Sequence, residues 1–185
     1  MKIFRDLLGI PPPPTPKEID QGLREIFDFI DSDLKANRDG HMSAKQRYWL
    51  VDKFLRKILP PIMITVVYSW FLFVSSNVAP VPSSDPANTS TFALFIWLIL
   101  VIWAVTAFID GWQLLTDILK QTVDVESGKG RAHVYRQQRA TFYRLVIAKS
   151  SFKIPKEAVE LLTNDEYYAV YFAPQSKVIL SVEVE

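Results

Sequence analysis

The sequence predicts an α+β membrane protein: an N-terminal helical arm, a two-helix transmembrane hairpin and a C-terminal small antiparallel β barrel, SH3-like or OB-like. Three observations lead to this fold class. Two long uncharged apolar runs lie in mid-chain, a helical apolar repeat precedes them, and short alternating segments follow them. We therefore expect three domains: a cytoplasmic arm with a Pro-rich spacer over 1–57, the hairpin over 58–119 and a cytoplasmic β-barrel domain over 120–185.

The hairpin is predicted from the runs 58–84 and 86–109, between which Asp85 is the single charged residue. Each run has room for the roughly 20 residues that a helix needs to cross a bilayer. We expect the spans at about 60–79 and 92–112, joined by an irregular Pro- and Ser-rich loop over 79–91. The first run begins after a long polar stretch, so we expect no cleavable signal peptide and a first span that stays in the mature chain.

Positive charge predicts the orientation of this hairpin. Lys and Arg flank the two spans on their outer sides, and the loop over 79–91 holds neither. The positive-inside rule therefore places both termini in the cytoplasm. The flanking residues are Arg47, Lys53, Arg56 and Lys57 before the first span, and Lys120, Lys129, Arg131, Arg136 and Arg139 after the second.

The composition restricts the kinds of binding and catalytic site that we expect in this chain. The 185 residues carry a net charge of +1, which disfavours a general nucleic-acid partner because such domains are usually strongly basic. There is no cysteine, which excludes cysteine-ligated metal sites. His41 and His133 are the only histidines, which disfavours a multi-histidine metal site within one chain. We therefore predict no catalytic residue, no cofactor and no metal site.

The arm is predicted to be helical after a Pro11–Pro14 spacer. Thr15-Pro16-Lys17-Glu18 forms a capping box, and the apolar residues that follow recur at helical spacing as far as Leu34, so one helix is expected to end near Asn37–Gly40. Ser43–Gln46 is a second capping box, and its helix should bend or break at Pro60-Pro61. The repeat consists of Ile19, Leu23, Ile26, Phe27, Ile30 and Leu34.

The segment 35–46 between these helices resembles a degenerate EF-hand loop. Lys35 occupies the first ligand position and Gln46 the last, where a calcium site needs carboxylates. The pattern favours a capped turn with Gly40 as the helix-ending glycine, and leaves open whether the loop binds anything.

Several side chains are candidates for membrane contacts. We expect interface anchors at the ends of the spans, contacts with another helix at mid-depth, and ion pairs of Asp110 and Asp117 with Arg56 or Lys57. The anchors are Tyr48, Trp49, Arg56, Lys57 and Trp112, and the intramembrane candidates are Thr65, Ser69, Trp70, Trp97, Trp103 and Thr106.

The β domain is predicted from about five short strands with one small helix before the last hairpin. Ser127–Gly130 is expected to turn a first hairpin, 142–149 and 152–154 to form strands, 155–162 a helix, and 167–173 and 177–184 the final hairpin. A basic and aromatic set in this domain suits anionic lipid headgroups or plain solvation better than nucleic acid. It comprises Arg131, Arg136, Arg139, Arg144, Tyr135, Phe142 and Tyr143.

The chain also resembles two-span bacterial membrane proteins that carry a small cytoplasmic β domain. The resemblance rests on Asn37–Gln46, the two spans, Phe152–Ala158 and Tyr167–Glu183. It implies the bacterial inner (plasma) membrane as the location, and it transfers no activity.

The function expected from these features is that of a non-enzymatic accessory or scaffold subunit, which presents the β domain and the arm to a partner or to a second copy. One alternative is an oligomeric channel or transport-related protein with a cytoplasmic gating domain, and another is a membrane-tethered ligand-sensing module. The expected partners are the lipid bilayer and either a protein or a second copy, with nucleic acid disfavoured.

Overall fold

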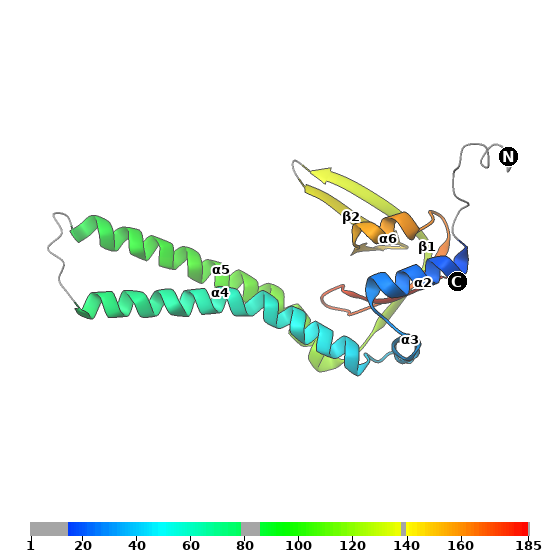
Figure 1. Ribbon diagram of the computed structural model, residues 1–185, viewed down its shortest axis with the longest axis horizontal. Coiled ribbons are helices and arrows are strands. Elements are labelled where there is room, and N and C mark those ends of the chain that lie inside the picture. The colour runs from blue at the N-terminus through cyan, green and yellow to red at the C-terminus, as the bar shows by residue number, and fades with distance from the viewer. Residues whose placement is uncertain (1–14, 79–85, 138–139, 185) are drawn as a thin grey trace. The chain divides into compact units, whose positions relative to one another are not determined.

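The computed structural model describes residues 15–78, 86–137 and 140–184 and combines helices with one antiparallel sheet (Figure 1). Its contacts divide the chain into two compact units. The first, here called the terminal unit, joins the residues up to Gln46 with those from Gln121 onward, and the second, the helical hairpin, is Arg47–Lys120. The elements are α2 (Pro16–Phe27), α3 (Asp31–Arg38), α4 (Ala44–Val78), α5 (Pro86–Lys120), β1 (Asp124–Gln137), β2 (Ala140–Ile147), β3 (Ser150–Lys153), α6 (Lys156–Leu161), β4 (Tyr167–Phe172) and β5 (Ile179–Val184).

The arm forms two helices rather than the single one predicted. Thr15 caps α2 in the expected capping box with Glu18, but the chain leaves the helix at Asp28, which has a left-handed φ of 51°. Lys45 Nζ donates to the carbonyl and to the carboxylate of Asp28, at 2.8 Å each. The side chain of Asp33 then accepts from the backbone of Ile30 and starts α3. Tertiary and capping bonds therefore override the continuous helical repeat. The Pro11–Pro14 spacer lies outside the described residues.

The predicted helix-ending glycine is confirmed. Gly40 has φ 78°, its N–H donates to the carbonyl of Asn37, and the N–H of His41 donates to that of Ala36. This pair of bonds is a Schellman motif, the usual way to close a helix on glycine. Ser43 and Gln46 exchange the two bonds of the second capping box. The segment 35–46 is thus a helix end followed by a helix start.

The five strands follow the order β3-β2-β1-β4-β5, and every neighbouring pair is antiparallel. β1 is shared between two partners, since Asp124–Lys129 pairs with β4 and Gly130–Gln137 pairs with β2. The predicted turn at Ser127–Gly130 is therefore wrong, because this stretch is extended backbone in the middle of one long strand. The order ends at β3 and β5 in the described chain, and no pairing shown there closes the barrel that the sequence predicted.

Both faces of β4 are buried, and the arm supplies a helix to each. Ile19 and Leu23 of α2 join Val170 and its neighbours in the main core. Leu34 of α3 packs with Tyr171 in a second cluster on the alternate residues of β4. The arm thus packs on both faces of the sheet at its β4–β5 end. The main core consists of Ile19, Leu23, Leu145, Ile147, Phe152, Ile154, Ala158, Leu162, Tyr168, Val170, Phe172, Ile179 and Val182.

The helical hairpin consists of α4 and α5, both long and apolar enough to cross a membrane. Only 11% and 6% of their most apolar stretches is buried within the chain, so neither behaves as the core helix of a soluble protein. α4 continues as one helix through Pro60 and Pro61, so the expected break does not occur, and the helix bends along its length (Figure 1). α5 begins at Pro86, so the second half of the predicted irregular loop is helical, while 79–85 lies outside the described residues.

Candidate functional site

Polar side chains join the two long helices along one seam. Trp97 Nε1 of α5 donates to Ser69 Oγ of α4 at 3.0 Å, and Tyr68 OH donates to the carbonyl of Ala93 at 3.3 Å. Thr65 Oγ1 lies 2.7 Å from the carbonyl of Pro61 in its own helix and 3.4 Å from that of Leu100. Hydroxyl and indole groups thus find partners inside the hairpin, as apolar surroundings require.

The other intramembrane candidates are more exposed or bond within their own helix. Trp70 is 68% exposed and Trp103 is 44% exposed, and the hydroxyl of Thr106 bonds to the carbonyl of Trp103 in its own helix. The hydroxyls of Thr65, Ser69 and Thr106 all donate to backbone carbonyls of their own helices. A shallow groove on α4 is lined by Thr65, Val66, Ser69, Trp70 and Phe73.

The predicted interface anchors are exposed on the hairpin. The ring of Trp49 carries the ammonium group of Lys53 at 4.6 Å, and Trp112 packs its ring against that of Phe108. Tyr48 is 77% exposed. Such amphipathic rings suit the headgroup level of a bilayer.

Two of the predicted interfacial ions meet across the hairpin. Lys57 Nζ of α4 lies 3.2 Å from Asp110 Oδ2 of α5. Arg56 instead pairs with Asp52 within α4, at 2.7 Å. Asp117 is fully buried.

The basic and aromatic set of the β domain separates onto two faces of the sheet. In an antiparallel pair, residues directly opposite each other project to the same side. Tyr135 faces Phe142, and Arg144 faces both His133 of β1 and Lys153 of β3. We call this side, with Arg131, His133, Tyr135, Phe142, Arg144 and Lys153, the outer face.

The remaining members of that set lie elsewhere. Arg136 and Tyr143 alternate with the outer-face residues, so they project to the side that carries the buried Leu145 and Ile147. Arg139 lies outside the described residues. The outer face therefore replaces the seven-residue set as the candidate surface, and Lys153 and His133 are the members that sequence reasoning missed.

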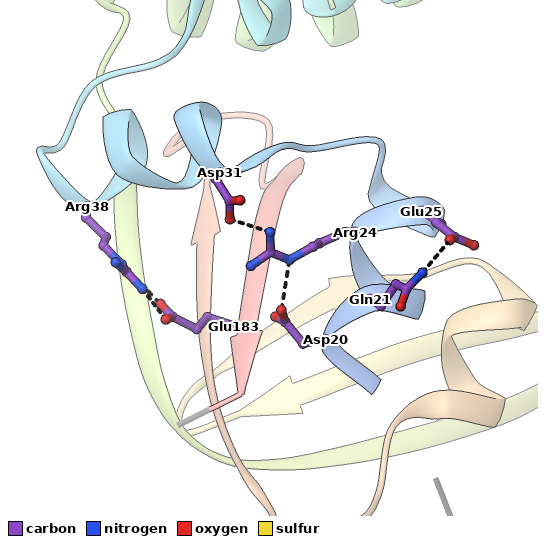
Figure 2. Close-up of polar contacts among 7 residues, drawn as sticks. All are labelled: Asp20, Gln21, Arg24, Glu25, Asp31, Arg38 and Glu183. Carbon is purple, nitrogen blue, oxygen red and sulfur yellow. Dashed lines mark hydrogen bonds and ion pairs between the residues drawn. The ribbon is translucent and has the colours of Figure 1, made fainter. Parts of the chain in front are cut away.

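A polar junction between the arm and β5 was also missed by sequence reasoning. Asn37 Nδ2 donates to Ser181 Oγ at 2.7 Å in a buried position. The next residue, Arg38, pairs with Glu183 of β5 (Figure 2). The hydrogen bond with Glu183 raises the pKa of Arg38, and burial raises the pKa of the neighbouring Tyr171. Arg24 bridges Asp20 and Asp31 in the same region (Figure 2). The bonds of Asn37 and Arg38 join the arm to β5, and those of Arg24 join α2 to the start of α3.

Within the described ranges, no group of three or more His, Asp and Glu side chains is placed to hold a metal ion. The geometry of the described residues provides helix contacts, a polar junction and one open charged surface.

Comparison of the chain with protein-family models, with curated proteins and with solved structures finds no match.

Proposed function

We propose that this chain is a non-enzymatic integral membrane protein, an accessory or scaffold subunit that carries the terminal unit on the cytoplasmic face and joins a partner or a second copy through its helical hairpin. The low burial of α4 and α5 carries this proposal. Apolar helices of this length with so little internal cover need lipid or other helices around them.

The side chains that α4 and α5 turn outward support association within the membrane. Trp70 and Phe73, which both line the groove on α4, are 68% and 62% exposed. Helices associate in lipid by van der Waals packing and interhelical hydrogen bonds, and broad aromatic rings supply much contact area. In the arm, by contrast, the apolar face of α2 is already buried against the chain's own sheet. We therefore assign the partner contact to the hairpin.

Association is tested by native mass spectrometry and by crosslinking in membranes, after extraction in a mild detergent. We expect an oligomer or a defined complex, and we expect Trp70→Ala to dissociate it because Trp70 lines the groove on α4. Phe71→Ala is the matched control, since Phe71 is equally exposed and does not line that groove. A lone protomer in both experiments would contradict the proposal.

The orientation is tested by cysteine labelling, for which the chain is suited because it has no native cysteine. A membrane-impermeant maleimide added to intact bacterial cells should label Ser83→Cys in the connection between the helices and leave Lys149→Cys in the terminal unit unlabelled. The reverse pattern would place both termini outside and refute the cytoplasmic location.

A further inference from the structure

We infer that the outer face of β1, β2 and β3 binds the anionic headgroups of the membrane in which the hairpin is anchored. This inference rests on the proposed membrane function and adds a second, peripheral contact with the bilayer. It starts from a local excess of positive charge. Between Glu126 and Glu157 there is no Asp or Glu, and there are eight basic residues, namely Lys129, Arg131, Arg136, Arg139, Arg144, Lys149, Lys153 and Lys156.

The register gathers part of this charge on one surface. Arg144 lies between His133 and Lys153, each directly opposite it across a strand pair. Like charges placed directly opposite each other destabilise a sheet. No carboxylate of the described chain pairs with Arg144 or Lys153, whereas Arg131 at the border of the face lies 3.1 Å from Asp165. An anion seated over Arg144 and Lys153 would relieve the repulsion between their positive charges.

Exposed rings continue the same surface toward the end of the β1–β2 hairpin. Tyr135 and Phe142 are opposite each other and are 51% and 40% exposed, and the rings of His133 and Tyr135 stack with centroids 6.0 Å apart. Aromatic rings beside basic side chains suit the boundary between lipid headgroups and acyl chains. There the rings are buried among the acyl chains and the basic groups stay at the phosphates.

Chain connectivity favours lipid over nucleic acid as the source of the phosphates. Only Gln121, Thr122 and Val123 separate α5 from β1, and the bridge between His41 and Thr122 brings the segments before α4 and after α5 together. The outer face lies on the same chain as the membrane helices, and its first residue, Arg131, follows Lys120 by eleven positions, so headgroups are present at a high effective concentration and weak contacts suffice. Nucleic acid would have to be attracted from solution by a chain of net charge +1.

The test uses the full chain in nanodiscs, with an environment-sensitive fluorophore on Ser151→Cys. Ser151 is exposed and lies on the outer face, opposite Val146. We expect a blue shift and quenching by headgroup-labelled lipid in nanodiscs that contain phosphatidylglycerol, and neither in pure phosphatidylcholine. Each basic residue removed should lower, about fivefold, the ratio of molecules whose outer face is bound to lipid to molecules whose outer face is unbound. The reason is that a basic residue near an anionic surface contributes about 1 kcal/mol.

Matched charge variants separate a site from a general charge effect. Arg144→Gln with Lys153→Gln should abolish most of the lipid-dependent shift, and Lys149→Gln with Lys156→Gln, which removes the same charge outside the outer face, should keep it. Equal loss in both pairs, or no dependence on phosphatidylglycerol in correctly inserted protein, would overturn the inference.

Two further outcomes would each lead to a different conclusion. A shift produced by an oligothymidylate, lost in Arg144→Gln with Lys153→Gln and absent with anionic nanodiscs, would assign the face to nucleic acid and overturn the lipid assignment. Failure of the chain to enter nanodiscs at all, judged by flotation, would refute the proposed membrane function and this inference with it.

Discussion

Two glycines of the terminal unit differ in what an added methyl group would meet. At Gly130 an ideal Cβ would lie 2.5 Å from Cδ2 of Tyr168, whose ring is fully buried and whose hydroxyl bonds to the backbone of Thr163. At Gly22 it would meet a terminal methyl group of Leu161, which is only partly buried. One neighbour is fixed and the other is able to turn away.

We predict that Gly130→Ala lowers the free energy of unfolding by about 1–3 kcal/mol, the usual cost of overpacking. Gly22→Ala should lie within about 1 kcal/mol of the wild type, because alanine is the better helix former and offsets the shift of Leu161. Thermal unfolding of both variants in detergent, followed by circular dichroism, gives the comparison. Equal destabilisation by the two substitutions would contradict the packing of β1 on Tyr168.

Tyr168 also predicts a dependence on pH. Burial raises the pKa of its phenol above the ordinary value near 10. The folded state thus holds the proton more tightly than the unfolded state. The stability that this provides is complete below about pH 10 and declines as the pH rises from the unfolded towards the folded pKa.

We therefore expect the unfolding temperature to fall between about pH 9.5 and 11, and Tyr168→Phe to make this fall shallower. The same variant should cost about 1 kcal/mol at pH 8, since the backbone of Thr163 loses its partner. Tyr135→Phe on the outer face is the control. An unchanged alkaline profile in Tyr168→Phe would show that this phenol is not the titrating group.

At the scale of elements, α2 shows how an amphipathic helix finds its cover. Ile19 and Leu23 are 1% and 0% exposed, and they reach the main core through contacts with β5 and α6. The helical spacing of these residues was readable from the sequence, as was the Thr15 cap. The element that covers them was not, because it lies more than 130 residues further along the chain.

We predict that Leu23→Ala destabilises the terminal unit by about 2–5 kcal/mol, the range found when a buried leucine is truncated. Gln21→Ala on the exposed side of α2 should be nearly neutral. The measurement is the free energy of unfolding from urea titrations in detergent. A neutral Leu23→Ala variant would mean that α2 is not docked on the sheet.

In β1, by contrast, the local composition predicts the wrong structure. Ser127-Gly128-Lys129-Gly130 has the composition of a turn. In the structure Lys129 still pairs with Tyr167 of β4, and Gly130 already pairs with Ile147 of β2, so the strand changes partner here without reversing. The close approach of Tyr168 explains the glycine at 130, and it depends on a strand that the local sequence does not contain.

At the scale of the whole molecule, the terminal unit is assembled from both ends of the chain. The buried bond between Asn37 and Ser181 and the ion pair between Arg38 and Glu183 join segments about 145 residues apart. The predicted division into an arm over 1–57 and a β domain over 120–185 treated these ends as separate. Their contacts make them interdependent.

We predict that a chain truncated after Lys120 loses hydrogen-exchange protection throughout α2 and α3, because the sheet that covers them is gone. The amides of α4 between Thr65 and Ser75 should stay protected in detergent and serve as the internal control, since those helical bonds do not need the sheet. Full protection of α2 in the truncated chain would show that the arm folds independently.

The sequence by itself determined the elements whose cause is local: the two apolar helices, the capping boxes at Thr15 and Ser43, the glycine closure at Gly40 and the strands from β2 to β5. Apolar runs, the spacing of apolar residues and helix caps depend on residues close together in the chain, so they can be recognised from the sequence alone. Only the tertiary structure decided the break at Asp28, the passage of β1 from β4 to β2, the docking of the arm on both sides of β4, and which basic and aromatic side chains share the outer face. Each of these depends on a partner distant in the chain or on strand register, where a shift of one residue turns every side chain to the opposite face.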